Sequence, residues 1–244
     1  MERRGLHGTT SPRPLVQLMA RLTAAIIVDA ATQLVEQDGA EALTVRRLGQ
    51  QLQADPTAIY RHFVNMQAIL AAVGDRLLGD VISQDMAAVA GDRIDNQQWR
   101  AVVVEACVRL RHANLARPAL ASLVRSGPSL RDNETAITEY LLSALLGAGL
   151  SIDAASSGYH ALIELTIGSA AIDARIDGLT PTERSKVYDE WRRHYAALDA
   201  TACPASSRAA NSLYRGSADQ RFDDALGLML DGLEARLERA APRE

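Results

Sequence analysis

Residues 43–63 read LTVRRLGQQLQADPTAIYRHF and predict two short helices joined by a tight turn. Val45, Leu48 and Leu52 recur at spacings of three and four, so they form one apolar stripe on a first helix. Thr44 lies just before this stripe, where its hydroxyl can accept a hydrogen bond from a free amide at the helix start. The stretch therefore begins with a capped amphipathic helix.

The second helix of this stretch begins at Asp55-Pro56, because aspartate caps a helix well and proline fits the first helical position. Ile59 and Phe63 lie four residues apart and are expected to point inward. A short helix that presents threonine, tyrosine and arginine from a rigid three-helix unit suits the DNA major groove. At about 100° per residue, the outward face is centred on Thr57 and Arg61, with Ala58 and Tyr60 on its flanks.

Residues 21–70 resemble the DNA-binding domain of the TetR/AcrR family of bacterial transcriptional regulators. The matching strings are LTVRRLGQQL and PTAIYRHFVNMQAIL, and the most specific part is the signature Tyr60-x-His62-Phe63. The resemblance covers about a fifth of the chain. It implies an all-helical protein with an N-terminal helix-turn-helix domain and a larger helical domain for ligand binding and dimerisation.

The resemblance also implies roles for individual side chains at DNA. Thr44 and Tyr60 would contact phosphates, Thr57 and Arg61 would lie near base edges, and His62 would help to fix the backbone beside them. The full expected DNA-binding set is Thr44, Arg46, Arg47, Pro56, Thr57, Ala58, Tyr60, Arg61 and His62.

One departure from the family pattern concerns charge. The family often has lysine where this chain has Met66, and Val64 is likewise uncharged. Arg46, Arg47 and the N-terminal segment 1–20 are candidates to supply the missing positive charge. Two interpretations of residues 1–20 stay open: a tail with no role, or a flexible arm that reaches DNA.

Composition favours helices and bounds the class of protein. The chain has 244 residues, of which 48% are hydrophobic and only 4% aromatic, and alternating strand patterns are scarce. Two distant cysteines form no metal or redox motif, and no apolar run is long enough for a membrane helix, which favours a cytoplasmic protein. Net charge is −4, but residues 1–70 carry seven arginines against six acids, so DNA binding would rest on a few placed contacts.

The periodicity along the chain predicts further helices and three regions. The second helix of the motif, which begins at Pro56 and would read the DNA, is here called the reader. A helix over 66–90 would start within three residues of the reader and act as a lever on it. We predict a break over 91–96 and a loop over 200–218. The regions are an arm (1–20), a helix-turn-helix domain (21–67) and a ligand-binding and dimerisation domain (68–244). The other expected helices span 22–37, 96–113, 118–125, 131–148, 152–176, 180–199 and 219–239.

A homodimer through helices 152–176 and 219–239 is expected, because both carry long apolar stripes and the family dimerises through such a pair. An ordinary intramolecular core would explain the stripes as well. One short reader helix rarely gives useful specificity, however, and two-fold dimers supply two half-sites.

Candidate chemical sites in the larger region have ordinary structural explanations beside the functional ones. The pairs His160/Glu164 and Glu190/His194 have the spacing of metal ligands but also that of exposed ion pairs. No catalytic group, metal or other cofactor is expected. The residues expected at a ligand are Trp99, His112, Tyr140 and Tyr159, each of which could equally be core or surface.

The predicted function is sequence-specific DNA binding as a transcriptional repressor, released from a palindromic operator by a small apolar effector. A dimeric regulator without an effector stays open as a first alternative. A helical enzyme or scaffold with a coincidental motif is the second.

Overall fold

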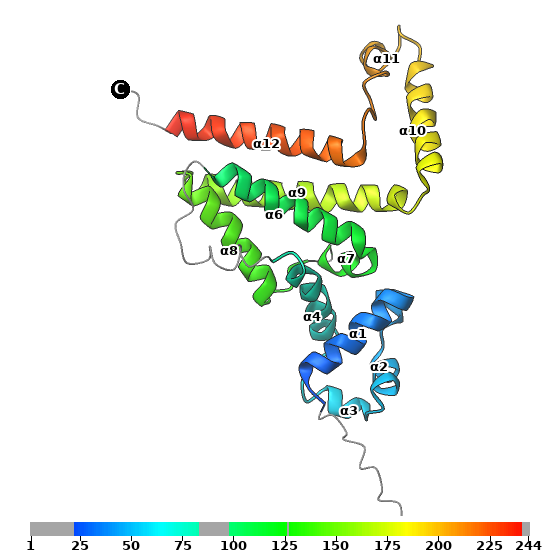
Figure 1. The fold of residues 1–244 in the computed structure, drawn as a ribbon, viewed down its shortest axis with the longest axis vertical. Helices are drawn as coiled ribbons and strands as arrows, with labels where there is room; N and C mark the ends of the chain where they lie inside the picture. Colours follow the sequence, from blue (N-terminus) through cyan, green and yellow to red (C-terminus); the bar gives the residue numbers. More distant parts are fainter. Residues whose placement is uncertain (1–21, 83–97, 126, 241–244) are drawn as a thin grey trace, which may run out of the picture.

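The computed structural model describes residues 22–82, 98–125 and 127–240, and these residues form helices without any strand. The all-helical fold class is therefore confirmed. Figure 1 shows a small lower unit, a larger body, and a projection at the far end. The helices are α1 (Ala24–Asp38), the short 3-10 helix η1 (Ala40–Ala42), α2 (Val45–Leu52), α3 (Pro56–Ile59), α4 (Met66–Gly79), α6 (Trp99–Ala116), α7 (Pro118–Val124), α8 (Asp132–Gly147), α9 (Ile152–Asp177), α10 (Pro181–Ala196), α11 (Pro204–Ala209) and α12 (Ala218–Ala240).

The lower unit, here called the head, consists of α1, η1, α2 and α3. Its helices begin at side-chain caps: the hydroxyl of Thr23 accepts from the Ile26 amide, and that of Thr44 accepts from the Arg47 amide. Gly39 ends α1 with φ +83°, a backbone conformation that favours glycine. These local signals explain where α1 and α2 begin and where α1 ends.

The core of the head extends beyond the head itself. Ile59 of α3 and Ile69 and Leu77 of α4 belong to one cluster of buried residues, which also includes Leu120 and Ala121 of α7. In Figure 1, α4 and α7 lie between the head and the rest of the molecule. A displacement of either helix must therefore disturb the packing of the head.

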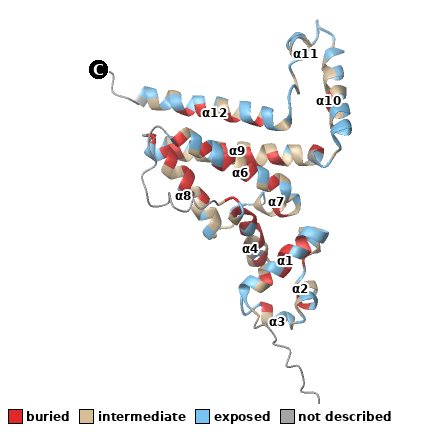
Figure 2. Ribbon diagram, in the orientation of Figure 1, coloured by how far each residue is buried: buried red, intermediate tan, exposed pale blue. Residues whose placement is uncertain are grey.

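The body is built from α6, α8, α9 and α12, which pack around a second buried cluster. Figure 2 shows its buried residues along the inner faces of these helices. At Gly158 of α9, a Cβ atom would lie only 2.9 Å from Cδ2 of Leu233 on α12, so the two helices approach closely there. Part of the apolar stripe of each helix is therefore an intramolecular contact.

The α10–α11 projection stands away from the body at the end of α9 (Figure 1). A capping box starts α10: the Thr180 hydroxyl accepts from the Glu183 amide, and the Glu183 carboxylate accepts from the Thr180 amide. Trp191 and Tyr214 pack with their ring centroids 4.8 Å apart and join the two ends of the projection.

Three expectations about helix boundaries need correction. The second helix of the motif is a single turn, Pro56–Ile59, followed by turns to His62. Helix α4 ends at Gly79 rather than near residue 90, since Asp80 and Val81 donate to carbonyls three residues back and tighten the chain. Within the expected loop 200–218, Pro204 starts the short helix α11.

Two expectations fall on parts of the chain outside the described residues. They are the N-terminal arm, 1–20, and the break over 91–96. Among the described helices, none combines the length and apolar character needed to cross a membrane.

Candidate nucleic-acid interface and internal cavity

Three features fix the position of the short helix α3: the turn before it, the side-chain cap at its start, and its buried side. A left-handed residue, Gln53 with φ +50°, forms the turn after α2. The Asp55 carboxylate accepts from the amide of Thr57 at 2.7 Å and from its hydroxyl at 2.6 Å. Ile59 is fully buried and Phe63 is 5% exposed, so the predicted inward pair is confirmed. This anchoring leaves the opposite side of α3 facing outward.

The outward side of α3 and of the turns that follow it carries Thr57, Tyr60, Arg61 and His62, all of which are exposed. Tyr60 is 47% exposed, which is unusual for so large an aromatic side chain. Arg61 has no salt-bridge partner among the residues that the structure describes. Hydrogen bonds from Thr57, aided by the positive charge of Arg61, hold the pKa of Asp55 below its ordinary value. The face therefore combines a hydroxyl, a phenol and a free guanidinium.

The start of α2 adds a second group of polar residues. Thr44 and Arg46 are exposed there, and the first amides of a helix favour anions. Arg47 is different, because its guanidinium pairs with Asp38 and also donates to the carbonyl of Ala42 at 3.3 Å. Arg46 is thus free to meet a phosphate, whereas Arg47 is occupied within the head.

Val64 is a residue that the sequence reasoning did not place on this face. It directly follows Phe63 and is 87% exposed, so an apolar side chain stands beside the reader helix. Such a side chain can contact the methyl group of thymine or the sugar edge of DNA. The sequence could have predicted this exposure, because Val64 lies outside the four-residue spacing of the inward-pointing Ile59 and Phe63.

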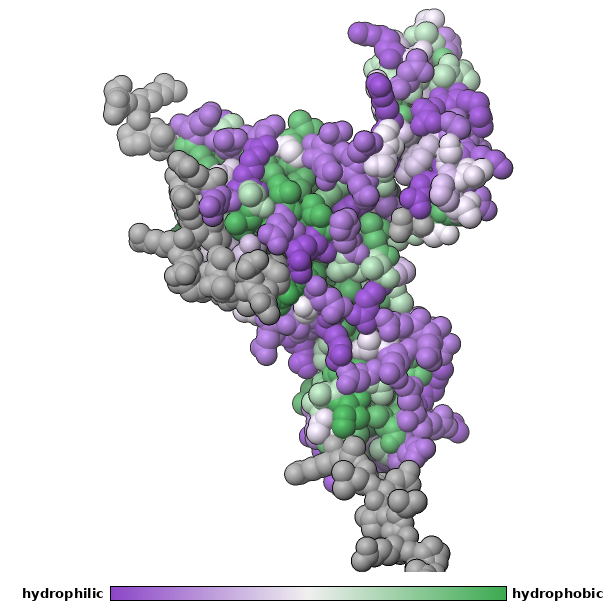
Figure 3. Space-filling view, viewed as in Figure 1, coloured by the Kyte–Doolittle hydropathy of each residue, from purple (hydrophilic) through white to green (hydrophobic). Residues whose placement is uncertain are grey.

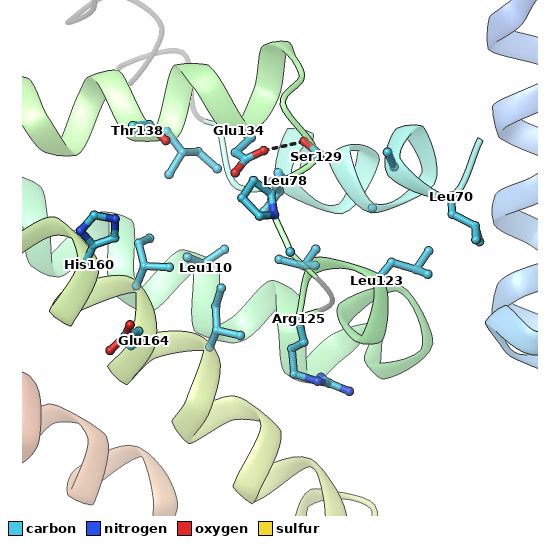
Figure 4. A pocket seen from close by; sticks show the side chains of 18 of the residues that line it. Leu70, Leu78, Leu110, Leu123, Arg125, Ser129, Glu134, Thr138, His160 and Glu164 are labelled. Carbon is cyan, nitrogen blue, oxygen red and sulfur yellow. Dashed lines mark hydrogen bonds between the residues drawn. The ribbon is translucent and has the colours of Figure 1, made fainter. Parts of the chain in front are cut away.

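A cavity of about 720 Å³ lies between α4, α7, α8 and α9, next to α6 (Figure 4). Its walls are mainly aliphatic, and α4 and α7 contribute to both this cavity and the core of the head. The volume is within the range of small-molecule sites. The aliphatic wall includes Leu70, Leu78, Leu110, Leu123, Ile137 and Ile163.

Polar groups on α8 and α9 line one part of the cavity, and Gln67 of α4 and Arg125 after α7 are further polar lining residues. The hydroxyls of Thr138 and Tyr159 are 2.9 Å apart, and His160 and Glu164 follow on the same wall. In Figure 4, the His160 and Glu164 side chains come from neighbouring turns of α9. No cluster of three or more metal-binding side chains occurs among the described residues. The wall is suited to hydrogen bonding with a bound molecule.

Of the four residues expected to bind a ligand, one lines the cavity and three do not. Tyr159 lines the cavity. Trp99 and Tyr140 lie in the buried cluster of the body and do not line the cavity, while His112 is exposed on α6. The polar residues that do line it, Glu164 among them, come from helices whose packing the local pattern did not specify.

The outer faces of α9 and α12 expose apolar side chains. Ile172 on α9 is 70% exposed and Leu228 on α12 is 75% exposed. A Cβ atom at Gly168 or Gly232 would meet nothing within 4 Å. In Figure 3, hydrophobic surface is visible on the body, whereas much of the α10–α11 projection is hydrophilic. Small and apolar residues facing outward are typical of a helix-helix interface.

These features together define a class of protein: a helix-turn-helix DNA-binding protein whose head shares two helices with an internal cavity. Residues 27–73 match the sequence model of bacterial regulatory proteins of the tetR family. Residues 94–237 match the tetracyclin repressor-like C-terminal domain. The chain belongs to the TetR family of transcriptional regulators.

Individual relatives agree with this assignment. The chain is 27% identical over 218 residues to the class C tetracycline repressor of Escherichia coli, covering 88% of this chain and 92% of that protein. It is 28% identical over 172 residues to an HTH-type transcriptional regulator of Saccharopolyspora erythraea, covering 70% of each. Among solved structures, apo ActR from Streptomyces coelicolor has a TM-score of 0.77 at 26% identity, covering 91% of this chain and 99% of that one.

ActR is also known with ligands. The structure of ActR in complex with actinorhodin has a TM-score of 0.75 with this chain at 26% identity, covering 88% of this chain and 98% of that one. A further structure contains ActR with (S)-DNPA.

Proposed function

We propose that this protein is a repressor that binds a near-palindromic operator as a dimer and is released by a small-molecule effector. The observation that carries the proposal is the exposed face of Thr57, Tyr60 and Arg61, on α3 and the turns after it, whose opposite side is anchored by Ile59 and Phe63. A rigid element with outward-facing polar groups is what major-groove reading requires.

The proposed DNA contacts divide into positioning and reading groups. Thr44, Arg46 and Tyr60 would bind phosphates, and Thr57 and Arg61 would read base edges. Pro56, Ala58 and His62 would lie at the rim of the same surface. Arg47 would contribute only after leaving Asp38. We propose a DNA-binding unit of residues 21–67 and a ligand-binding and dimerisation unit of 68–244, joined through α4 and α7.

We propose that α9 and α12 of two chains form the dimer. Their outward apolar residues, Ile172 and Leu228, would be buried against the partner chain. Two readers related by a two-fold axis would then meet half-sites about 34–36 Å apart on one face of the duplex.

The effector would occupy the cavity beside α4 and α7. Its walls fit a largely apolar molecule with polar groups that meet Tyr159, His160 or Glu164. The complexes of ActR with actinorhodin and (S)-DNPA support small organic molecules as the effector class. A regulator without an effector is the alternative. A thermal-shift screen separates the two, since a ligand that binds the folded state stabilises it by an amount that rises with the ligand concentration relative to its Kd.

We assign no catalytic residue or cofactor to the chain. TetR-family regulators are generally DNA-binding proteins without enzymatic activity. As a repressor, the protein would act on DNA in the cytoplasm.

Selection of bound duplexes from a random pool tests the proposal. A near-palindrome with half-sites one helical turn apart is expected. Recovery of no enriched sequence at physiological salt, from a protein shown to be dimeric by sedimentation, would contradict it.

A further inference from the structure

Asp75 on α4 is a buried carboxylate that lies between the cavity and the helices around it. It is 8% exposed, and no salt bridge joins it to a basic side chain of the described residues. Burying an ionised group in this way is unfavourable unless hydrogen bonds replace its water. The hydrogen-bond donors around the Asp75 carboxylate therefore show which part of the chain Asp75 holds in place.

Among the described residues, the hydrogen-bond partners of the Asp75 side chain all belong to the start of α8 or the loop before it. Its Oδ1 accepts from the Glu134 amide at 3.0 Å and from the Ser129 hydroxyl at 3.1 Å. Its Oδ2 accepts from the side-chain amide of Asn133 at 3.0 Å and, at 3.4 Å, from the Asn133 backbone amide. The residue in the capping position of α8, Arg131, provides no side-chain cap. Asp75 thus caps α8 from another helix.

The group that Asp75 caps is also part of the cavity wall. Ser129 and Glu134 line the cavity, together with Gly127 and Pro128. The single proton of the Ser129 hydroxyl is shared between the Glu134 carboxylate at 2.8 Å, as drawn in Figure 4, and Asp75 Oδ1 at 3.1 Å. The Glu134 carboxylate also accepts from the Leu130 amide at 2.7 Å. A molecule that contacts Ser129 or Glu134 would compete with or reorient these hydrogen bonds.

Asp75 itself belongs to α4, the helix that follows the reader in the chain. Its neighbour Gly74 faces the cavity and α7, where a Cβ atom would lie 3.3 Å from that of Leu123. Val73 and Leu77, two residues away in each direction, are buried in the core of the head. Helix α4 begins at Met66, three residues after Phe63. A rigid connection therefore runs from the cavity loop through Asp75 to the start of α4.

We propose that Asp75 is the positioning residue that couples occupancy of the cavity to the placement of the reader helix. This inference rests on the proposed function, because it assigns the regulation of the same cavity. In the empty protein, Asp75 fastens α4 to the start of α8. An occupant that draws Ser129 or Glu134 away weakens this fastening and lets α4 shift, together with the head.

The variant Asp75→Asn tests the proposal with little change in shape. An asparagine has one acceptor oxygen, and its NH2 group would face donors, so it loses hydrogen bonds to the start of α8. Asp199→Asn is the matched control, because Asp199 accepts from the Thr201 amide at 2.8 Å in the turn after α10, outside the cavity lining. Ser129→Ala is a milder second variant that removes only the loop hydroxyl.

Hydrogen exchange of the full-length dimer gives the first measurement and needs no DNA or effector. In Asp75→Asn, amides of both α4 (66–79) and the start of α8 (132–136) are expected to exchange at least tenfold faster than in the wild type. Ser129→Ala should give a smaller rise in the same two segments, and Asp199→Asn should give none there. An increase confined to 132–136 would overturn the proposal, because it would make Asp75 a local cap.

The second measurement is the coupling between DNA and a cavity probe. The probe is 1-anilinonaphthalene-8-sulfonate, a fluorescent molecule that binds apolar cavities, and the DNA is the duplex selected by the wild type. We expect saturating duplex to weaken probe binding by tenfold or more in the wild type and Asp199→Asn. In Asp75→Asn, the ratio of the two probe Kd values should fall below threefold, and affinity for the duplex should be lower than in the wild type, because the loosened α4 lets the head shift as an occupant of the cavity would.

The possible failures are distinguishable. Retention of the full wild-type ratio by Asp75→Asn overturns the role of Asp75 but leaves the proposed function intact. A wild-type protein that selects no duplex, or whose probe affinity ignores DNA, contradicts the proposed function instead. In that case, the exchange rates still decide whether Asp75 fastens α4 to α8.

Discussion

Replacing Arg61 by alanine is the most direct perturbation of the proposed reader. The Arg61 guanidinium is exposed and has no salt-bridge partner among the described residues, so its removal breaks no ion pair within the chain. A specific contact to a base edge contributes roughly 1–3 kcal/mol. A dimer has two such contacts, so the loss should be roughly 2–6 kcal/mol, or a fall in operator affinity of about 30-fold to about 10⁴-fold.

Fluorescence anisotropy with the selected duplex measures this loss, and the salt dependence identifies the type of contact. If Arg61 reads bases, affinity for random DNA should change little and the salt slope should be nearly kept. If Arg61 binds phosphate, the slope should fall by about 0.9 per contact. Arg208→Ala is the matched control, because Arg208 on α11 is likewise exposed, has no salt-bridge partner among the described residues, and lies on the α10–α11 projection away from the head. Operator affinity within threefold of the wild type, in a correctly folded dimer, would refute the assignment of this face.

Three further predictions concern packing, reactivity and the cavity. Gly49→Ala should lower operator affinity and destabilise the head by about 1–3 kcal/mol in thermal unfolding, since the new Cβ would lie 3.0 Å from the carbonyl oxygen of Ala54 in the turn; unchanged unfolding would contradict this. Burial raises the pKa of Cys107 from 9.0 to about 11, so at pH 8 its thiol stays protonated and a disulfide reagent should titrate Cys203 but not Cys107 until the protein unfolds. Fast reaction of two thiols per native chain would show that this interior is open. Ile163→Trp should fill the cavity and reduce binding of the fluorescent probe at least tenfold while operator binding persists; probe binding equal to the wild type would mean that the probe binds elsewhere.

The motif itself was predictable because its signals are local. The spacing of Leu48 and Leu52, the caps at Thr44 and Asp55, and the inward pair Ile59 and Phe63 each depend on residues within one or two helical turns. The exposure of the reader face follows from the same periodicity. The length of α3 did not, since a single turn followed by looser turns satisfies the same inward spacing.

The sequence by itself determined the helical class, the capped helix-turn-helix and the resemblance to its family, because periodicity and capping act between near neighbours in the chain. Only the tertiary structure decided that Arg47 turns to Asp38, that Tyr159 and Glu164 face one cavity, and that Asp75 caps a helix 58 residues further on. These contacts depend on how whole helices pack against one another. Packing depends on the combined shape of many side chains, so it cannot be deduced from the spacing of residues within a single helix.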